Sequence, residues 1–269
     1  MGYTFGFIGT GNMGGALARA ACRRRPEQVV LTNRTLEKAV ALAEELDCDI
    51  AMDNEAVARE AQYIFLGVKP QMMEGLLRSL ASTLAARADR YVLVSMAAGL
   101  SIARLQEMLG FAAPILRIMP NTPCAIGQGM ILYAASEQVT EAEVEEFCDK
   151  MAGAGRFDAL EERLMDAASA VSGCGPAFVY QFIEAMADGG VACGLPRAKA
   201  QEYAAQTLAG AAGMVLVTGR HPGQLKDEVC SPGGSTIAGV YALEQGGVRA
   251  AVMGAVVASW KKNGELGKQ

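Results

Sequence analysis

The stretch Thr4–Ala21, TFGFIGTGNMGGALARAA, decides the first half of the fold. It begins as a short apolar strand, passes through the pattern GxGxxG at Gly9, Gly11 and Gly14, and continues as an alanine-rich helix. In this order the glycines are typical of a dinucleotide-binding turn: the first permits the tight turn, the second lets a pyrophosphate approach the backbone, and the third allows close helix packing. The helix start adds amide donors and positive potential. This context disfavours the alternative of an ordinary glycine-rich turn.

Two halves of the chain differ in their hydrophobic pattern. Up to about residue 160, short apolar runs alternate with amphipathic helical patterns, and we expect strands at 4–8, 29–32, 64–68, 92–96 and 115–119. A capping box, Thr140-x-x-Glu143, predicts the start of a helix. Beyond Glu161 only helical patterns rich in Ala, Gly and Met remain. The sequence therefore predicts an α/β fold, with a Rossmann-type dinucleotide-binding domain at 1–160 followed by an all-helical domain at 161–269 that serves oligomerisation.

Composition narrows the class of protein. The chain has 269 residues, 51% of them hydrophobic, a formal net charge of −5 and no basic run longer than Arg23–Arg25. These values predict a large core and disfavour a nucleic-acid or membrane partner, so we expect a small-molecule partner. Seven cysteines without CxxC spacing, no metal-ligand pattern and no basic leader predict a reduced, cytoplasmic protein without a metal. The uncharged segments 167–183 and 203–219 predict buried interface helices, hence a homodimer that builds a higher homo-oligomer.

The end of the second expected strand bears on the choice of cofactor. Its sequence is Asn33-Arg34-Thr35, without the acid that usually holds the ribose hydroxyls of NAD. An arginine there can hold a 2'-phosphate, which favours NADPH, with NADH as a second possibility. A solvated surface role for Arg34 is the alternative.

The loops after the later strands complete the expected cofactor site. Ligands of doubly wound sheets lie outside the carboxyl ends of the strands. Lys69 could be a base or a surface charge, but we favour a role for Lys69 and Pro70 in shaping the loop. The expected cofactor contacts are Ile8, Gly9, Thr10, Gly11, Asn12, Met13, Gly14, Asn33, Arg34, Val68, Lys69, Pro70, Ala97 and Ala98.

A second unusual segment lies near the C-terminus, where two acids and the turn SPGGST, residues 231–236, precede a helical pattern. One interpretation is that Ser235 or Thr236 caps the helix. The other is an anion site, because glycines let the backbone come close and a helix start attracts negative charge.

The segments FIGTGNMGGALA, FLGVKPQ, VSMAAGLSI, RIMPNTPCAIGQGM, VSGCGPAFVYQFIEAMADGGVACGLPRAKA and LKDEVCSPGGSTIAGVYALEQGGVRAAVMGAV closely resemble the pyrroline-5-carboxylate reductase family, in that family's order and over nearly the whole chain. The resemblance implies an NAD(P)H-dependent oxidoreductase that transfers a hydride to the C=N carbon of 1-pyrroline-5-carboxylate and gives L-proline, the last step of proline biosynthesis.

The resemblance also implies site residues. Thr236, the candidate catalytic residue, is expected near the ring nitrogen of the substrate, either to orient it or to donate a proton. Expected substrate contacts are Glu162, Asp227, Gly233, Gly234, Ser235 and Thr236, and Asn54 is an expected nucleotide contact. Glu228 stands where relatives often have Asn or Gln, which leaves its role open. Cys174 replaces a common Ser and is interpreted as a packing residue, and His221 as a structural one.

Two other functions remain as alternatives. A 3-hydroxyacid dehydrogenase would need a catalytic lysine on a helix of the second half, where the first lysine after residue 175 is Lys199. If the protein were a non-catalytic NADPH-binding sensor or scaffold, the SPGGST segment would have no function in it.

Overall fold

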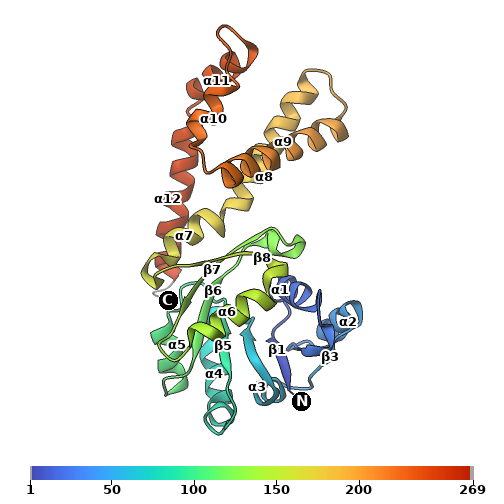
Figure 1. The fold of residues 1–269 in the computed structure, drawn as a ribbon, viewed down its shortest axis with the longest axis vertical. Coiled ribbons are helices and arrows are strands. Elements are labelled where there is room, and N and C mark those ends of the chain that lie inside the picture. Colours follow the sequence, from blue (N-terminus) through green and yellow to red (C-terminus); the bar gives the residue numbers. More distant parts are fainter. Residues whose placement is uncertain (1, 267–269) are drawn as a thin grey trace. The chain divides into compact units, whose positions relative to one another are not determined.

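The computed structural model describes residues 2–266, which form two compact units (Figure 1). The first comprises the chain up to Cys174 together with the segment from Ser259 onward, and the second comprises Gly175–Ala258. The units divide later than the expected boundary at residue 160. The reason is that Met165, on the next helix, is fully buried in the core of the first unit.

An eight-stranded sheet forms the centre of the first unit. Its order is β3-β2-β1-β4-β5-β6-β7-β8, and only the β6–β7 pair is antiparallel. The strands are β1 (Tyr3–Ile8), β2 (Val29–Thr32), β3 (Asp49–Ile50), β4 (Ala61–Leu66), β5 (Val92–Ser95), β6 (Ile115–Met119), β7 (Gly129–Ala135) and β8 (Gly155–Ala159). All five expected strands are present, whereas the sequence patterns missed β3, β7 and β8.

Helices cover both faces of this sheet (Figure 1). In β4, Tyr63 and Phe65 point into one core and Ile64 and Leu66 into the other, as the two-residue period of a strand requires. On the first face lie α1 (Asn12–Cys22), α2 (Leu36–Leu46) and α6 (Glu141–Lys150). On the second lie α3 (Asn54–Glu60), α4 (Pro70–Ala85), α5 (Ile102–Leu109) and α7 (Met165–Ser172).

The second unit consists of helices. They are α8 (Gly175–Ala192), α9 (Arg197–Thr218), α10 (Pro222–Glu228), α11 (Ser235–Gln245) and the greater part of α12 (Val248–Leu266). Pro196 stands at the N-cap of α9 and Pro222 in the first turn of α10, as proline's fixed φ favours. No helix among the described residues is long and apolar enough to cross a membrane.

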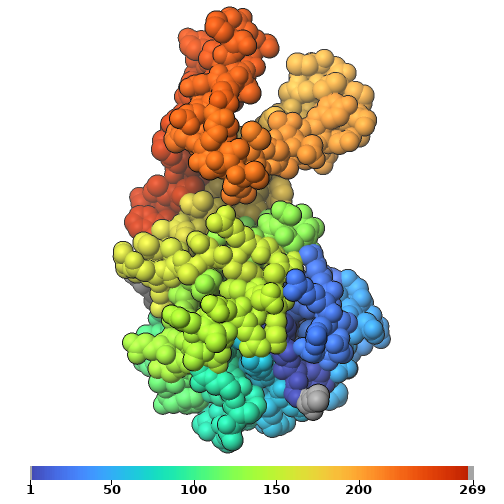
Figure 2. All heavy atoms as spheres, in the orientation of Figure 1, coloured from blue at the N-terminus to red at the C-terminus, as the bar shows by residue number. Residues whose placement is uncertain are grey.

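This helical unit buries little of its own apolar surface. Its buried cluster is Ala187, Ala200 and Ala204. In Figure 2 the α8–α9 pair (yellow to orange) and the α10–α11 segment (orange-red) separate toward their ends, with open space between them. Large apolar side chains remain exposed on these helices, among them Tyr180, Met186, Leu216, Val217, Tyr241, Leu243 and Met253. An apolar surface of this extent marks an interface with another molecule.

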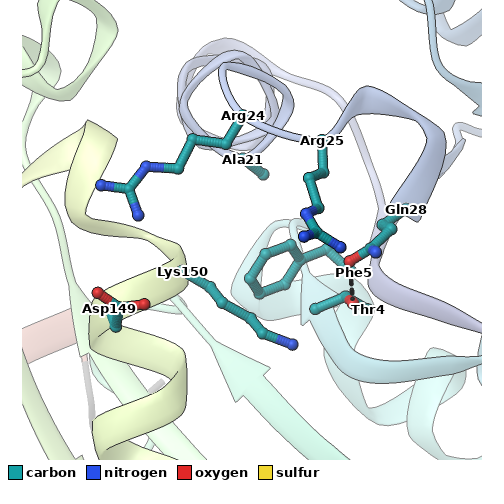
Figure 3. Close-up of a pocket in the computed structure, with 8 residues that line it drawn as sticks. All are labelled: Thr4, Phe5, Ala21, Arg24, Arg25, Gln28, Asp149 and Lys150. Carbon is teal, nitrogen blue, oxygen red and sulfur yellow. Dashed lines mark hydrogen bonds between the residues drawn. The ribbon is translucent and has the colours of Figure 1, made fainter.

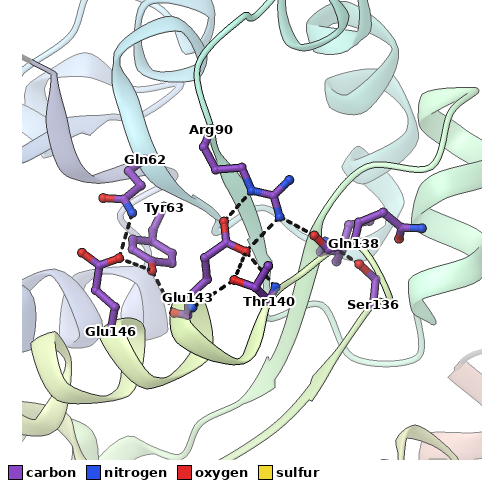
Figure 4. A network of polar contacts seen from close by, with 9 residues as sticks. Gln62, Tyr63, Arg90, Ser136, Gln138, Thr140, Glu143 and Glu146 are labelled. Atoms are coloured by element: carbon purple, nitrogen blue, oxygen red, sulfur yellow. Dashed lines mark hydrogen bonds and ion pairs between the residues drawn. The ribbon is translucent and has the colours of Figure 1, made fainter.

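The predicted capping box at the start of α6 is confirmed and belongs to a larger polar network (Figure 4). Glu143 Oε2 accepts from the amide and the hydroxyl of Thr140 at 2.8 and 2.9 Å. Arg90 contacts the same carboxylate twice, at 2.5 and 2.8 Å, and also donates to the carbonyl of Gln138. These donors lower the pKa of Glu143 to about 2, and the hydrogen bonds from Arg90 have the largest effect.

This network generates a prediction for stability. Glu143→Gln keeps a capping side chain but removes the charge that Arg90 binds, so unfolding free energy at pH 7 should fall by about 1 to 3 kcal/mol. Because the pKa is lowered in the folded state, the carboxylate stabilises the fold above the unfolded value near 4.5, and this is lost as pH falls toward about 2. Urea unfolding from neutral to acid pH should show the difference shrinking. Glu141→Gln, an exposed acid in the same turn, is the control. A difference independent of pH would contradict the assignment.

Candidate functional site

The glycine loop between β1 and α1 has the geometry that a dinucleotide requires. Gly9 has φ +99°, a conformation that favours glycine. A Cβ at Gly14 would lie 2.3 Å from the carbonyl oxygen of Gly9, so only glycine lets α1 approach the strand this closely. A Cβ at Gly11 would meet nothing within 4 Å, and Gly11 is exposed. The first and third glycines therefore build the turn, while the second leaves its outer side open.

A fourth glycine, Gly67, follows the end of β4 and packs directly against this loop. A Cβ on Gly67 would lie 2.3 Å from the oxygen of Gly9, and one on Gly9 would lie 2.5 Å from the oxygen of Gly67. The amide of Gly67 also donates to the carbonyl of Ile8 at 2.8 Å. The ends of β1 and β4 thus meet backbone to backbone.

The loop after β2 is tied to the glycine loop by Asn33. Its Oδ1 accepts from the amide of Thr10 at 3.3 Å, and its Nδ2 donates to the carbonyl of Thr35 at 3.0 Å. Arg34 is exposed, and its guanidinium has no hydrogen bond or ion pair with any residue from 2 to 266. Asn33 therefore fixes the loop and leaves the positive charge of Arg34 free for a ligand.

The remaining expected cofactor residues follow other strands along the same edge of the sheet. Asn54 begins α3, whose N-cap is the side chain of Asp53. Lys69 is the extended N-cap residue of α4, with Pro70 next, so both shape the start of that helix. Val68 precedes them, and Ala97 and Ala98 follow β5, one buried and one exposed. Since β1 to β6 run parallel, all these loops lie at the carboxyl ends of the strands.

In the second unit, the SPGGST segment forms a tight turn followed by an uncapped helix. The amide of Gly234 donates to the carbonyl of Ser231 at 3.0 Å, and Gly233 has φ +70° after Pro232, the pattern of a type II turn. Gly234 is the N-cap residue of α11, which has no side-chain cap. The interpretation that Ser235 or Thr236 caps the helix is therefore wrong, since both lie inside its first turn.

This arrangement leaves donors free. The first amides of α11 receive no acceptor from a capping side chain. Ser235 and Thr236 are exposed, and neither hydroxyl bonds to another residue of the described chain. Amides, hydroxyls and the positive end of the helix dipole together suit an anion such as a carboxylate.

The acids before this turn have partners on or beside α10. Asp227 is exposed and lies 2.6 Å from Nζ of Lys226. Glu228 binds the guanidinium of Arg220 through both oxygens, and this contact lowers its pKa. His221 caps α10, its Nδ1 accepting from the amide of Gly223 at 3.1 Å, so its structural interpretation is confirmed.

Glu162 lies in the first unit, where sequence reasoning missed its partner. Its Oε1 accepts from Arg117 at 2.9 Å and from the amide of Ile102 at 2.8 Å. Arg117 is buried on β6 and also lies 3.6 Å from Asp166. The sequence did contain a signal for this partner, because an arginine inside the apolar strand ILRIM needs an acid to bind. Glu162 therefore joins β6 to the start of α5.

The structure thus gathers the expected cofactor residues at one edge of the first unit. Asp227, Gly233, Gly234, Ser235 and Thr236 lie together on the α10–α11 segment of the second unit. No group of three or more His, Cys, Asp or Glu side chains suited to a metal occurs within residues 2–266.

Comparison with known proteins gives the family. Residues 162–266 match the family described as pyrroline-5-carboxylate reductase dimerisation, and residues 4–99 match that described as NADP oxidoreductase, coenzyme F420-dependent. Pyrroline-5-carboxylate reductases of Pisum sativum and Escherichia coli are each 40% identical, over 98% of this chain and 96% and 98% of their own. A Plasmodium falciparum pyrroline carboxylate reductase with NADP bound has a TM-score of 0.85 at 33% identity, covering 98% of both chains. The chain belongs to the pyrroline-5-carboxylate reductase family.

Proposed function

We propose that this protein is a pyrroline-5-carboxylate reductase, which reduces the C=N bond of 1-pyrroline-5-carboxylate with NADPH and releases L-proline, the last step of proline biosynthesis. Full-length relatives at 40% identity carry this name. The structural observation that supports it most is the uncapped start of α11 behind a glycine turn, in a chain that also holds a dinucleotide loop.

The residues of the glycine loop fit NADPH. The open side of Gly11 and the start of α1, which has no side-chain cap and no acid in its first turn, leave room and donors for a pyrophosphate. We propose that Arg34 binds the 2'-phosphate, supported by its free guanidinium. Bound there, the dinucleotide supplies the hydride. The loops of Asn54, Lys69 and Ala98 are proposed to contact the remaining parts of the cofactor.

The helical unit is proposed to bind the substrate. The amides at the start of α11 would hold its carboxylate, and Gly233, with its positive φ, turns the chain just before that helix start. Thr236 would hydrogen bond to the ring nitrogen. An aliphatic hydroxyl is a very weak acid, so we assign Thr236 to orientation, with the proton coming from solvent or already present on an iminium substrate. Asp227 and Glu162 remain proposed contacts, and the bonds of Glu162 to Arg117 and Ile102 favour a positioning role.

The two alternative functions are less well supported. Lys199, the residue that a 3-hydroxyacid dehydrogenase would have to use, is exposed and ion-paired with Glu202 at 2.9 Å. A sensor without catalysis would not need the free donors of Ser235 and Thr236.

The match of residues 162–266 to the dimerisation family indicates that the chain forms a homo-oligomer. We propose further that dimers join into a higher oligomer. We also propose that residues up to about 160 serve cofactor binding and those from 161 onward serve substrate binding and assembly, a functional division that lies earlier in the chain than the division into compact units. The free state of all seven cysteines supports a cytoplasmic location.

Cofactor preference tests the role of Arg34. NADPH should give a higher kcat/KM than NADH. Arg34→Ala should weaken the binding of NADPH by about 1 to 3 kcal/mol and change the binding of NADH little, because only NADPH carries the 2'-phosphate. Steady-state kinetics with both cofactors measure this, and Arg156→Ala, an exposed arginine on β8, is the control. Equal losses of affinity for NADPH and NADH would contradict the assignment of Arg34 to the 2'-phosphate.

Substitution of Thr236 separates orientation from acid catalysis. A lost hydrogen bond predicts that Thr236→Ala lowers kcat/KM by about 10- to 100-fold, while Thr236→Ser keeps most activity. NADPH affinity should stay unchanged. Kinetics from acid to alkaline pH check this. A fall of about 10² to 10⁴ with partial rescue by a small external acid would instead mean proton donation, and no loss at any pH would leave Thr236 a structural residue.

Assembly can be tested at the apolar groove of the second unit, which Phe182, Leu243 and Met253 line. Light scattering at micromolar concentration should give at least a dimer. Met253→Glu should lower the mass toward the monomer because it places a charge in this groove. Lys38→Glu, an exposed residue of α2, is the control. A wild-type monomer, or an unchanged mass for a folded Met253→Glu protein, would contradict assembly through this surface.

A further inference from the structure

A second cavity, of about 530 Å³, lies in the first unit between the end of α1, the start of β1 and the end of α6 (Figure 3). Arg24 and Arg25 reach it from the α1 side, and Asp149 and Lys150 from α6. Its size falls in the range of small-molecule sites.

This cavity is separate from the cofactor loop. Thr4 and Gln28, which line it, lie at the amino ends of β1 and β2, whereas Gly9 follows the carboxyl end of β1. Four residues of extended β1, residues 5–8, lie between Thr4 and Gly9, which places the two about 16 Å apart. A ligand here therefore would not occupy the dinucleotide site.

Two arginines at the cavity have no partner within the described chain. The hydrogen bonds and ion pairs of residues 2–266 include none from the guanidiniums of Arg24 and Arg25, while the neighbouring Arg23 donates to Gly153 and Ala125 at 2.6 and 3.0 Å. The end of α1 favours positive charge through the helix dipole. That explains why cations stand there, but not why two guanidiniums beside a cavity bind no carboxylate.

The other polar groups of the lining add donors. Gln28 Oε1 accepts from the hydroxyl of Thr4 at 2.8 Å, which leaves the amide NH₂ of Gln28 free to donate. Lys150 contacts Glu146 through one carboxylate oxygen at 2.8 Å and keeps further N–H groups. Asp149 is the single acid in a lining with three cations. The cavity is therefore a net cationic site rich in donors.

The geometry of these donors favours phosphate. Guanidinium groups match phosphate oxygens in pairs, and several cations around one cavity suit a chain of phosphates better than a single anion. The ring of Phe5 also lines the cavity but is only 4% exposed, so it offers little face for a base to stack on. Recognition should therefore rest on the phosphate chain.

We propose that this cavity binds a polyphosphate chain, either inorganic or carried by a nucleoside triphosphate, at a site independent of the cofactor. Arg24 and Arg25 bind the outer phosphates, with Lys150 and Gln28 completing the set of donors.

The test uses full-length protein saturated with NADP⁺, which fills the dinucleotide site. Calorimetric titration with sodium tripolyphosphate at low ionic strength should show one site per chain with Kd below about 1 mM. The Arg24→Gln/Arg25→Gln protein should bind at least about tenfold more weakly. Arg78→Gln, an exposed arginine of α4 on the opposite face of the sheet, should bind as the wild type does.

Reductase kinetics separate this proposal from the proposed function. The double variant should keep its kcat/KM, which also shows that it is folded. Asp149→Asn should bind tripolyphosphate more tightly, since it removes the one negative charge. Equal affinity for ATP and tripolyphosphate supports recognition of the chain alone, and tighter ATP binding supports a nucleotide. Absence of binding by the wild type, unchanged binding by the double variant, or an equal loss in Arg78→Gln would overturn the proposal.

Discussion

The backbone contact between Gly9 and Gly67 is the constraint on which the cofactor half depends. Any side chain at either position would overlap the carbonyl oxygen of the other, at 2.5 Å or less. With both glycines present, the ends of β1 and β4 meet, and Gly14 brings α1 against the same strand end. In the same loop, Gly11 has an open outer side and α1 begins without a side-chain cap. Asn33 then joins the next loop to it.

The two loops of the chain that suit anions are built on the same physical principle. Each places a glycine with positive φ, Gly9 or Gly233, one or two residues before an unoccupied helix start. In both, the usual capping side chain is missing, and the stabilisation that a cap gives, about 1 kcal/mol, is left for a ligand to supply. Local stability is thus lower at these two proposed anion sites, and a bound anion would restore it.

Periodicity and glycine spacing predicted five strands of the sheet and the glycine loop from the sequence. Buried parallel strands are continuous apolar runs, and β2 and β6 were predicted with their observed ends. The short edge strand β3 has two exposed residues and therefore no apolar signal, while β8 is mostly polar and pairs only with β7. The N-cap residue of α11 could not be predicted, because Gly234, Ser235 and Thr236 are all acceptable at that position. The turn that ends at Gly234 determines where the helix begins. The partners of Glu162 depend on β6 and α5, which are distant in sequence.

The helical unit buries only three alanines as its own core, although it contains about a third of the chain. Three alanines contribute far less hydrophobic free energy than ordering five helices costs in conformational entropy. Association between copies, which the dimerisation match indicates, buries further apolar surface, so folding of this unit is coupled to subunit pairing. Its thermal midpoint should then rise with protein concentration, as mass action requires of an oligomer. Dilution acts on this half of the molecule as a denaturant does on an ordinary domain.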